Sequence, residues 1–174
     1  MSGKLINIST LIINQPTKSI RLNLMSGLQR LKKELKDIIS NPPDGITAGL
    51  VKENNPYDWV ATLIGPAGTP YAGAVFTLDI NFPKNYPFKP PNIKFATPIF
   101  HCNVSTHGII CLDILKDNWS PALTTEKVLM SINCLLIDPN PNDPLVPDIA
   151  NLFRANKPEH DRIAREHAQK YALN

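Results

Sequence analysis

The stretch that decides the fold spans residues 46–95 and reads ITAGLVKENNPYDWVATLIGPAGTPYAGAVFTLDINFPKNYPFKPPNIKF. It contains four short runs rich in apolar and β-branched residues, at 46–51, 59–64, 75–80 and 93–95. Short turns separate the first three runs, and no helical pattern lies between them. Successive strands joined this closely favour an antiparallel meander.

Helical periodicity flanks this stretch on both sides. Before it, apolar side chains recur at helical spacing at Leu24, Leu28, Leu31, Leu35 and Ile38. Asn41-Pro42-Pro43 predicts the end of that helix. After it, residues 125–137 (with Thr124 as the N-cap), 148–155 and 158–172 predict three more helices. The order of one helix, four strands, an irregular loop and three helices predicts an α+β fold.

The chain of 174 residues is long enough for one domain with its own core. We expect that domain to cover residues 25–174. Residues 1–24 lack a clear period and are expected to form a flexible N-terminal extension, with a possible short strand at 11–13.

Composition excludes several classes of protein. A net charge of +3 is too small to indicate a nucleic-acid-binding protein. No apolar run approaches the ~20 residues that a membrane span needs, and the N-terminus lacks the pattern of a signal peptide. The odd number of cysteines, 3, argues against a disulfide framework. We therefore expect a monomer with free thiols, in the cytoplasm or the nucleus.

Residues 99–124 hold two of the three cysteines and two of the four histidines. Taken alone, Cys111 is a nucleophile, a metal ligand or an inert buried thiol, which is the usual state of a lone cysteine. A zinc site would use His101, Cys102, His107 and Cys111. However, residues 101 and 102 are neighbours, and the spacing lacks a paired C-x2-C.

Three motifs together carry a resemblance to a known family. They are FPKNYPFKPPNIKF at 82–95, GIICLDILKDNWSPALT at 108–124 and DPNPNDPLVPDIA at 138–150. With Trp59 and Trp119, this order and spacing resembles the ubiquitin-conjugating enzymes over residues 25–174. The likeness is greatest to the ubiquitin-dedicated members that serve many ligases. It implies one four-stranded antiparallel sheet with a helix before it and three helices after it.

The resemblance also implies an activity. Cys111 would accept the C-terminus of ubiquitin from the activating enzyme as a thioester and pass it to a lysine of a protein substrate. A RING, U-box or HECT ligase would hold the complex. The enzyme itself would bind no cofactor and no metal, since ATP is used upstream by the activating enzyme. The alternative is a non-catalytic scaffold that binds ubiquitin or a ligase, although such members lack the acceptor cysteine.

Two residues that precede Cys111 in the chain, His101 and Asn103, match the family's loop motif. The usual His-Pro-Asn is replaced here by His101-Cys102-Asn103. The resemblance makes Asn103 the side-chain amide that stabilises the oxyanion during transfer, or alternatively a residue that braces its own loop. His101 would be structural. We expect Cys102 to be an exposed or half-buried substitute for proline, and its oxidation to couple it to Cys111 is a further hypothesis.

Polar residues after the cysteine match the family's acceptor-lysine site. Asp113 and Asp143 would orient the incoming ammonium and receive its proton, with Asn140 as a polar neighbour. The alternative is that both carboxylates only cap local turns.

The resemblance further assigns binding surfaces. The ligase surface would comprise Arg30, Pro87, Phe88, Ser120, Pro121 and Ala122. Basic residues of the first helix would meet the activating enzyme, a contact weakened by Gln29. Met130 and Ile114 would touch the carried ubiquitin, and Thr47 would lie where some relatives bind a second ubiquitin.

Overall fold

The computed structural model describes residues 18–172, with side chains from residue 26 onward. The strand considered at 11–13 lies outside the described residues. No helix in the described part of the chain is long and apolar enough to cross a membrane.

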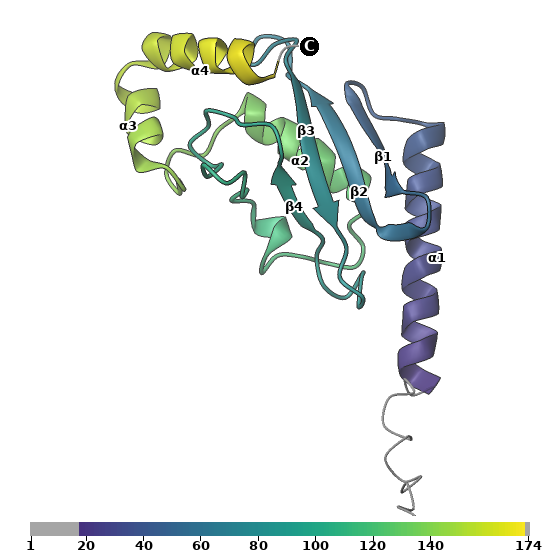
Figure 1. The fold of residues 1–174 in the computed structure, drawn as a ribbon. Helices are drawn as coiled ribbons and strands as arrows, with labels where there is room; N and C mark the ends of the chain where they lie inside the picture. The colour runs from purple at the N-terminus through teal and green to yellow at the C-terminus, as the bar shows by residue number, and fades with distance from the viewer. Residues whose placement is uncertain (1–17, 173–174) are drawn as a thin grey trace, which may run out of the picture.

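One four-stranded antiparallel sheet forms the centre of the molecule (Figure 1). Its strands, in spatial as well as chain order, are β1 (Ile46–Lys52), β2 (Asn55–Ile64), β3 (Val75–Asn81) and β4 (Asn92–Phe95). The register places Trp59 opposite Ile80 and Leu63 opposite Phe76, so large apolar side chains share one face. The predicted meander is confirmed.

Four helices surround the sheet. They are α1 (Lys18–Ser40), α2 (Thr125–Ile137), α3 (Pro147–Ala155) and α4 (Lys157–Tyr171). α2 begins as predicted, because the backbone N–H of Lys127 donates to the Thr124 hydroxyl at 3.3 Å.

The start of α1 differs from the prediction. The sequence predicts a flexible extension over residues 18–24, but α1 already begins at Lys18. This segment contains lysine, arginine and leucine, which favour helix, and it lies after Pro16. The weak apolar period in this segment did not indicate a helix, because the first turns of α1 project beyond the sheet (Figure 1).

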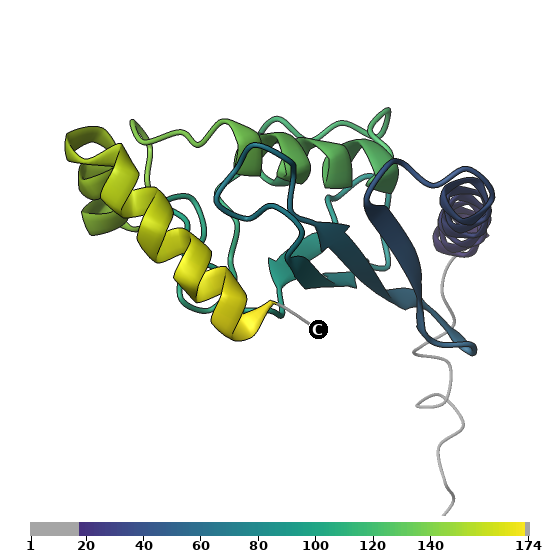
Figure 2. The ribbon, with the colours of Figure 1, turned by 90° about the horizontal axis from the view of Figure 1, so that it is seen from above.

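The core lies between the sheet and α2. Seen from above, α2 crosses one face of the sheet, α1 stands beside β1, and α4 lies at the opposite end (Figure 2). α2 contributes the buried side chains Val128, Leu129, Ile132, Leu135 and Leu136. Each such side chain stabilises the fold by about 1.5–3 kcal/mol through burial alone. The α2–sheet interface is thus a large part of the core, which also includes Leu31 and Ile38 of α1 and Ala164 and Ala168 of α4.

The irregular segment after β4 returns along the edge of the sheet. Two isolated antiparallel bridges join Lys94 to Ile109 and Val104 to Ile110. Gly108, which directly precedes Ile109, adopts a φ of 80°, and a Cβ at this position would approach the Phe95 carbonyl oxygen to 2.0 Å. Only glycine combines this backbone conformation with this contact. The turn at Gly108 therefore fixes where the following residues, including Cys111, leave the sheet.

Candidate active site

Cys111 lies at the end of this returning segment and is partly exposed. Its backbone N–H donates to the Asn103 carbonyl at 2.9 Å, which holds it beside residues 101–104. Two charged groups contact its sulfur. The Lys116 ammonium donates to Sγ at 3.4 Å, and Sγ lies 3.8 Å from Oδ2 of Asp143. The thiol thus faces a cation and a carboxylate.

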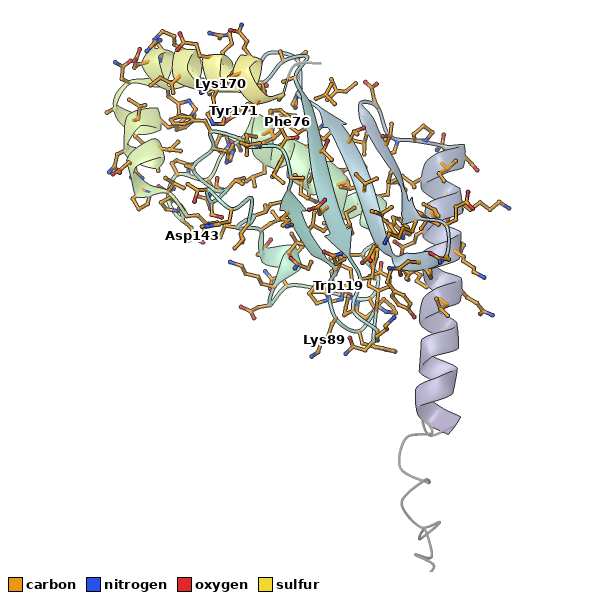
Figure 3. All side chains as sticks on the ribbon, in the orientation of Figure 1. Phe76, Lys89, Trp119, Asp143, Lys170 and Tyr171 are labelled. Carbon is orange, nitrogen blue, oxygen red and sulfur yellow. The ribbon has the colours of Figure 1, made fainter. Side chains whose placement is uncertain are left out.

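A cavity of about 660 Å³ surrounds this sulfur. It is lined by Cys111, Leu112, Asp113, Lys116, Asp117, Asn118, Leu135, Asn140 and Asp143. Four of the five residues predicted to act in catalysis therefore meet in one groove. Asp143 comes from the loop that joins α2 to α3, on the side of the molecule remote from α1 (Figure 3).

Asn103 differs from the other four because it is buried, with 1% of its surface exposed. Its Nδ2 donates to the carbonyls of Asn140 (2.8 Å) and Asp143 (3.1 Å). Its Oδ1 accepts from the Asn140 N–H at 2.9 Å and the Cys102 thiol at 3.3 Å. These four bonds use the full capacity of the amide. The side chain therefore braces the loop that carries Asp143, and its role towards an oxyanion stays a prediction.

His101 is buried beside Asn103 and makes two hydrogen bonds. Nδ1 accepts from the Asn103 backbone N–H at 3.0 Å, so Nε2 carries the proton and donates to the Leu135 carbonyl at 3.0 Å. Burial lowers the pKa of His101 to about 4. A neutral imidazole with both nitrogens bonded is a structural group, as predicted.

The prediction that Cys102 is exposed or half-buried is wrong. The residue is buried, with 1% of its surface exposed. Its carbonyl accepts from the backbone N–H groups of Leu145 (2.8 Å) and Val146 (3.0 Å), which draws this residue under the 138–146 loop. Burial raises the pKa of its thiol. Cys102 and Cys111 are both free thiols.

The two acidic residues have different surroundings. Asp113 is exposed, and its carboxylate accepts from Asn118 Nδ2 at 2.8 Å and the Ile114 N–H at 2.7 Å. The bond from Asn118 and then that from Ile114 lower the pKa of Asp113. These bonds cap the local turn, and the role of Asp113 towards an incoming lysine stays a prediction. Asp143 instead directs its carboxylate at the sulfur.

Comparison with protein families agrees with this arrangement. The family model described as ubiquitin-conjugating enzyme matches residues 30–168. The chain belongs to the ubiquitin-conjugating enzyme family. The match covers all four strands, α2, α3 and every residue of the groove around Cys111. The family and fold predicted from the three motifs are thus confirmed.

The sequence analysis missed Lys116, the groove residue whose side chain contacts the Cys111 sulfur. It follows the short 3-10 helix Asp113–Leu115, where the chain turns so that the Lys116 N–H donates to the Asp113 carbonyl at 2.9 Å. This turn brings a lysine five positions after the cysteine back to its sulfur. The signal in the sequence was a lysine one tight turn away from a candidate nucleophile.

The predicted ligase surface comes from three separate segments. Phe88 is 62% exposed, and Ser120, Pro121 and Ala122 are exposed as well. The Trp119 indole donates to the Pro87 carbonyl at 2.8 Å and thus joins the two loops. Arg30 on α1 donates to the Leu123 carbonyl at 2.9 Å. Trp119 and Lys89 lie at the same end of the molecule (Figure 3).

The remaining predicted contacts occupy other surfaces. Met130 is exposed on α2, Ile114 is half-buried, and Gln29 is exposed on α1. Thr47 is exposed on β1, where its hydroxyl pairs with that of Thr62.

The geometry of the described residues does not favour the alternative zinc site. Within the part of the chain with assigned structure, no group of three or more His, Cys, Asp and Glu side chains could hold a metal ion. His101 and Cys102 are engaged with Leu135 and Asn103, whereas His107 contacts Thr106 at the hairpin turn.

Proposed function

We propose that this protein carries ubiquitin as a thioester on Cys111 and transfers it to substrate lysines with the help of a ligase. The observation that carries the proposal is the accessible Cys111 thiol, which faces Lys116 and Asp143 in one groove of a member of this family. The surrounding loops are braced from beneath by Asn103 and His101.

Charging is a transfer from one sulfur to another. The Cys111 thiolate attacks the carbonyl carbon of the thioester that joins ubiquitin to the activating enzyme. A new C–S bond forms, the old one breaks, and the thiolate of the activating enzyme leaves. The Lys116 ammonium donates to the attacking sulfur at 3.4 Å, and the Asp143 carboxylate lies 3.8 Å from it in the same groove.

Discharge transfers the same acyl group to nitrogen. The substrate amine attacks the thioester carbonyl, a C–N bond forms, and the C–S bond to Cys111 breaks. The proton that the amine loses passes to a base, and Asp143 is the carboxylate beside the sulfur. Asp113 and Asn140 line the same groove and orient the ammonium before it reacts.

A charging assay tests this function. With the activating enzyme, ATP and ubiquitin, the wild type should form an adduct of the mass of enzyme plus ubiquitin that reductant removes. Cys111→Ser should form an oxygen ester that survives reductant, and Cys111→Ala should form none. If the wild type stays uncharged while a known conjugating enzyme is charged in parallel, the non-catalytic scaffold becomes the better interpretation.

The proposed partners are ubiquitin, the activating enzyme and RING, U-box or HECT ligases, in the cytoplasm or nucleus. The groove needs no bound cofactor for this chemistry, because ATP is spent by the activating enzyme. Offering ubiquitin and related modifiers side by side in the same assay tests the proposed ubiquitin-dedicated subclass. Equal charging with another modifier would contradict it.

A further inference from the structure

Glu34 on α1 is the one buried carboxylate among the side chains that the structure describes, with 6% of its surface exposed. Removing a carboxylate from water costs several kcal/mol unless it is paired and fully hydrogen-bonded. The groove around Cys111 does not include Glu34. Its burial therefore needs another explanation.

Four donors satisfy the two oxygens of this carboxylate. Oε1 accepts from the Arg30 guanidinium and from the Tyr86 hydroxyl, the latter at 2.8 Å. Oε2 accepts from the backbone N–H and the hydroxyl of Thr125, both at 2.7 Å. Thr125 is the first residue of α2, where the helix dipole also favours a negative charge.

Two of these donors stay protonated beside Glu34. Burial disfavours the charge on Arg30, but the hydrogen bond and the negative charge of Glu34 outweigh it and raise the pKa of the guanidinium. Burial, and then the charge of Glu34, raise the pKa of Tyr86, which stays protonated as a donor.

These donors lie in, or next in the chain to, the three segments that form the predicted ligase surface. Arg30 is itself a surface residue on α1 and also binds the Leu123 carbonyl, just after Pro121 and Ala122. Tyr86 directly precedes Pro87 and Phe88 in the chain. One carboxylate therefore contacts α1, the loop that carries Phe88 and the helix that follows Pro121.

A second contact shows how closely these segments are packed. Gly27 lies two turns before Glu34 on the same face of α1, and a Cβ there would approach the Tyr86 carbonyl oxygen to 2.6 Å. The Tyr86 ring also packs 5.9 Å from that of Trp119. The relative position of the two exposed loops is thus set by contacts around Glu34.

We propose that Glu34 is a positioning residue for ligase docking, which fixes Arg30, the Phe88 loop and the Pro121 loop as one rigid surface. This inference rests on the proposed function, because it takes that surface to bind RING or U-box domains. A rigid surface binds without the cost of ordering its loops. Glu34 would act on docking without touching the ligase.

Glu34→Gln tests the carboxylate with almost no change in size. Each oxygen of Glu34 faces a donor that cannot become an acceptor, namely the Arg30 guanidinium on Oε1 and the Thr125 backbone N–H on Oε2. In Glu34→Gln, whichever oxygen is replaced by the amide NH2 would therefore place a donor against one of these two donors. Asp37→Asn is the matched control, because it makes the same change in charge on α1 at an exposed pair with Lys33.

The measurement uses the full-length chain and a panel of isolated RING and U-box domains. The dissociation constant of the tightest binder should rise about tenfold for Glu34→Gln and less than twofold for Asp37→Asn. In ligase-stimulated discharge, the concentration of RING domain for half-maximal rate should rise similarly, while the rate at saturating RING domain and ligase-free charging stay within twofold. A general loss of structure would instead lower RING binding, ligase-stimulated discharge at saturating RING domain and ligase-free charging together.

A double-mutant cycle with Phe88→Ala separates positioning from stability. If Glu34 acts through the docking surface, Glu34→Gln should weaken RING binding much less when Phe88 is already absent. Where Glu34→Gln fails to fold, Tyr86→Phe removes one donor and should raise the same dissociation constant about threefold.

The outcomes are distinguishable from those of the proposed function. A wild type that is never charged overturns the proposed function. A wild type that is charged and binds a RING domain, with Glu34→Gln and Asp37→Asn binding equally well, overturns this inference alone. Full additivity of Glu34→Gln and Phe88→Ala would also overturn it.

Discussion

Asn103 and Glu34 each hold distant segments of the chain together, in two regions of the molecule and with different chemistry. Each is a buried polar side chain that uses four hydrogen bonds to join segments far apart in the sequence. Asn103 is neutral, both donates and accepts, and braces the loop of Asp143. Glu34 is charged, only accepts, and depends on Arg30. A neutral side chain costs less free energy to bury, whereas a charged one causes a larger loss of stability when one of its partners is removed.

Glu34→Ala should give the largest loss of stability and is the strongest test of that difference. It would leave a half-buried guanidinium, the Tyr86 hydroxyl and the Thr125 N–H without their acceptor. We expect the free energy of unfolding to fall by ~4 kcal/mol, measured by urea denaturation at pH 7.5. A loss below that of Asn103→Ala would reverse the comparison.

Asn103→Ala should cost somewhat less, ~3 kcal/mol in the same measurement, because the groups it leaves unpaired are all neutral. Its structural effect should be concentrated in the 138–146 loop, where Asn140 and Asp143 lose their bonds to the amide. Faster amide exchange in that loop, with α1 unchanged, would support this. Protection unchanged in both regions would show that the brace is dispensable.

Acid should destabilise the region around Cys111 through His101, by a smaller amount. Folded His101 has a pKa of about 4 against an ordinary value of 6.5, so the unfolded chain binds its proton first as the pH falls. The stability is complete above pH 6.5 and is lost between 6.5 and 4. From pH 7.5 to 5 the loss should be about 2 kcal/mol by urea denaturation. The His101→Gln variant should lose most of this dependence, and an equally steep dependence would rule out His101 as its source.

The sequence predicted regular elements far better than the two braces. The meander and the last three helices followed from local periodicity and turn residues, which act over a few positions. Asn103 was recognised, but its partners lie 37 and 40 residues away, so no local pattern could show that its amide is fully engaged. The same holds for the burial of Cys102 under the 138–146 loop.

Glu34 was not singled out from the sequence. Its position carried a signal nonetheless, because it falls three residues after Leu31 and four before Ile38, within the apolar stripe of α1. A carboxylate in such a stripe indicates a buried ionic contact. What the sequence could not supply was the identity of the donors, since Tyr86 and Thr125 come from other elements.

The left-handed turn at Gly108 has a consequence for how this protein can vary. Any side chain there would collide with the Phe95 carbonyl oxygen and also occupy a disfavoured backbone conformation, whereas Gly49 has no neighbour within 4 Å of its missing Cβ. In a saturation library selected for activity, position 108 should admit a single amino acid, while position 49 tolerates many. We therefore expect position 108 to stay glycine in evolution, because a side chain there would displace the segment that brings Cys111 to the surface.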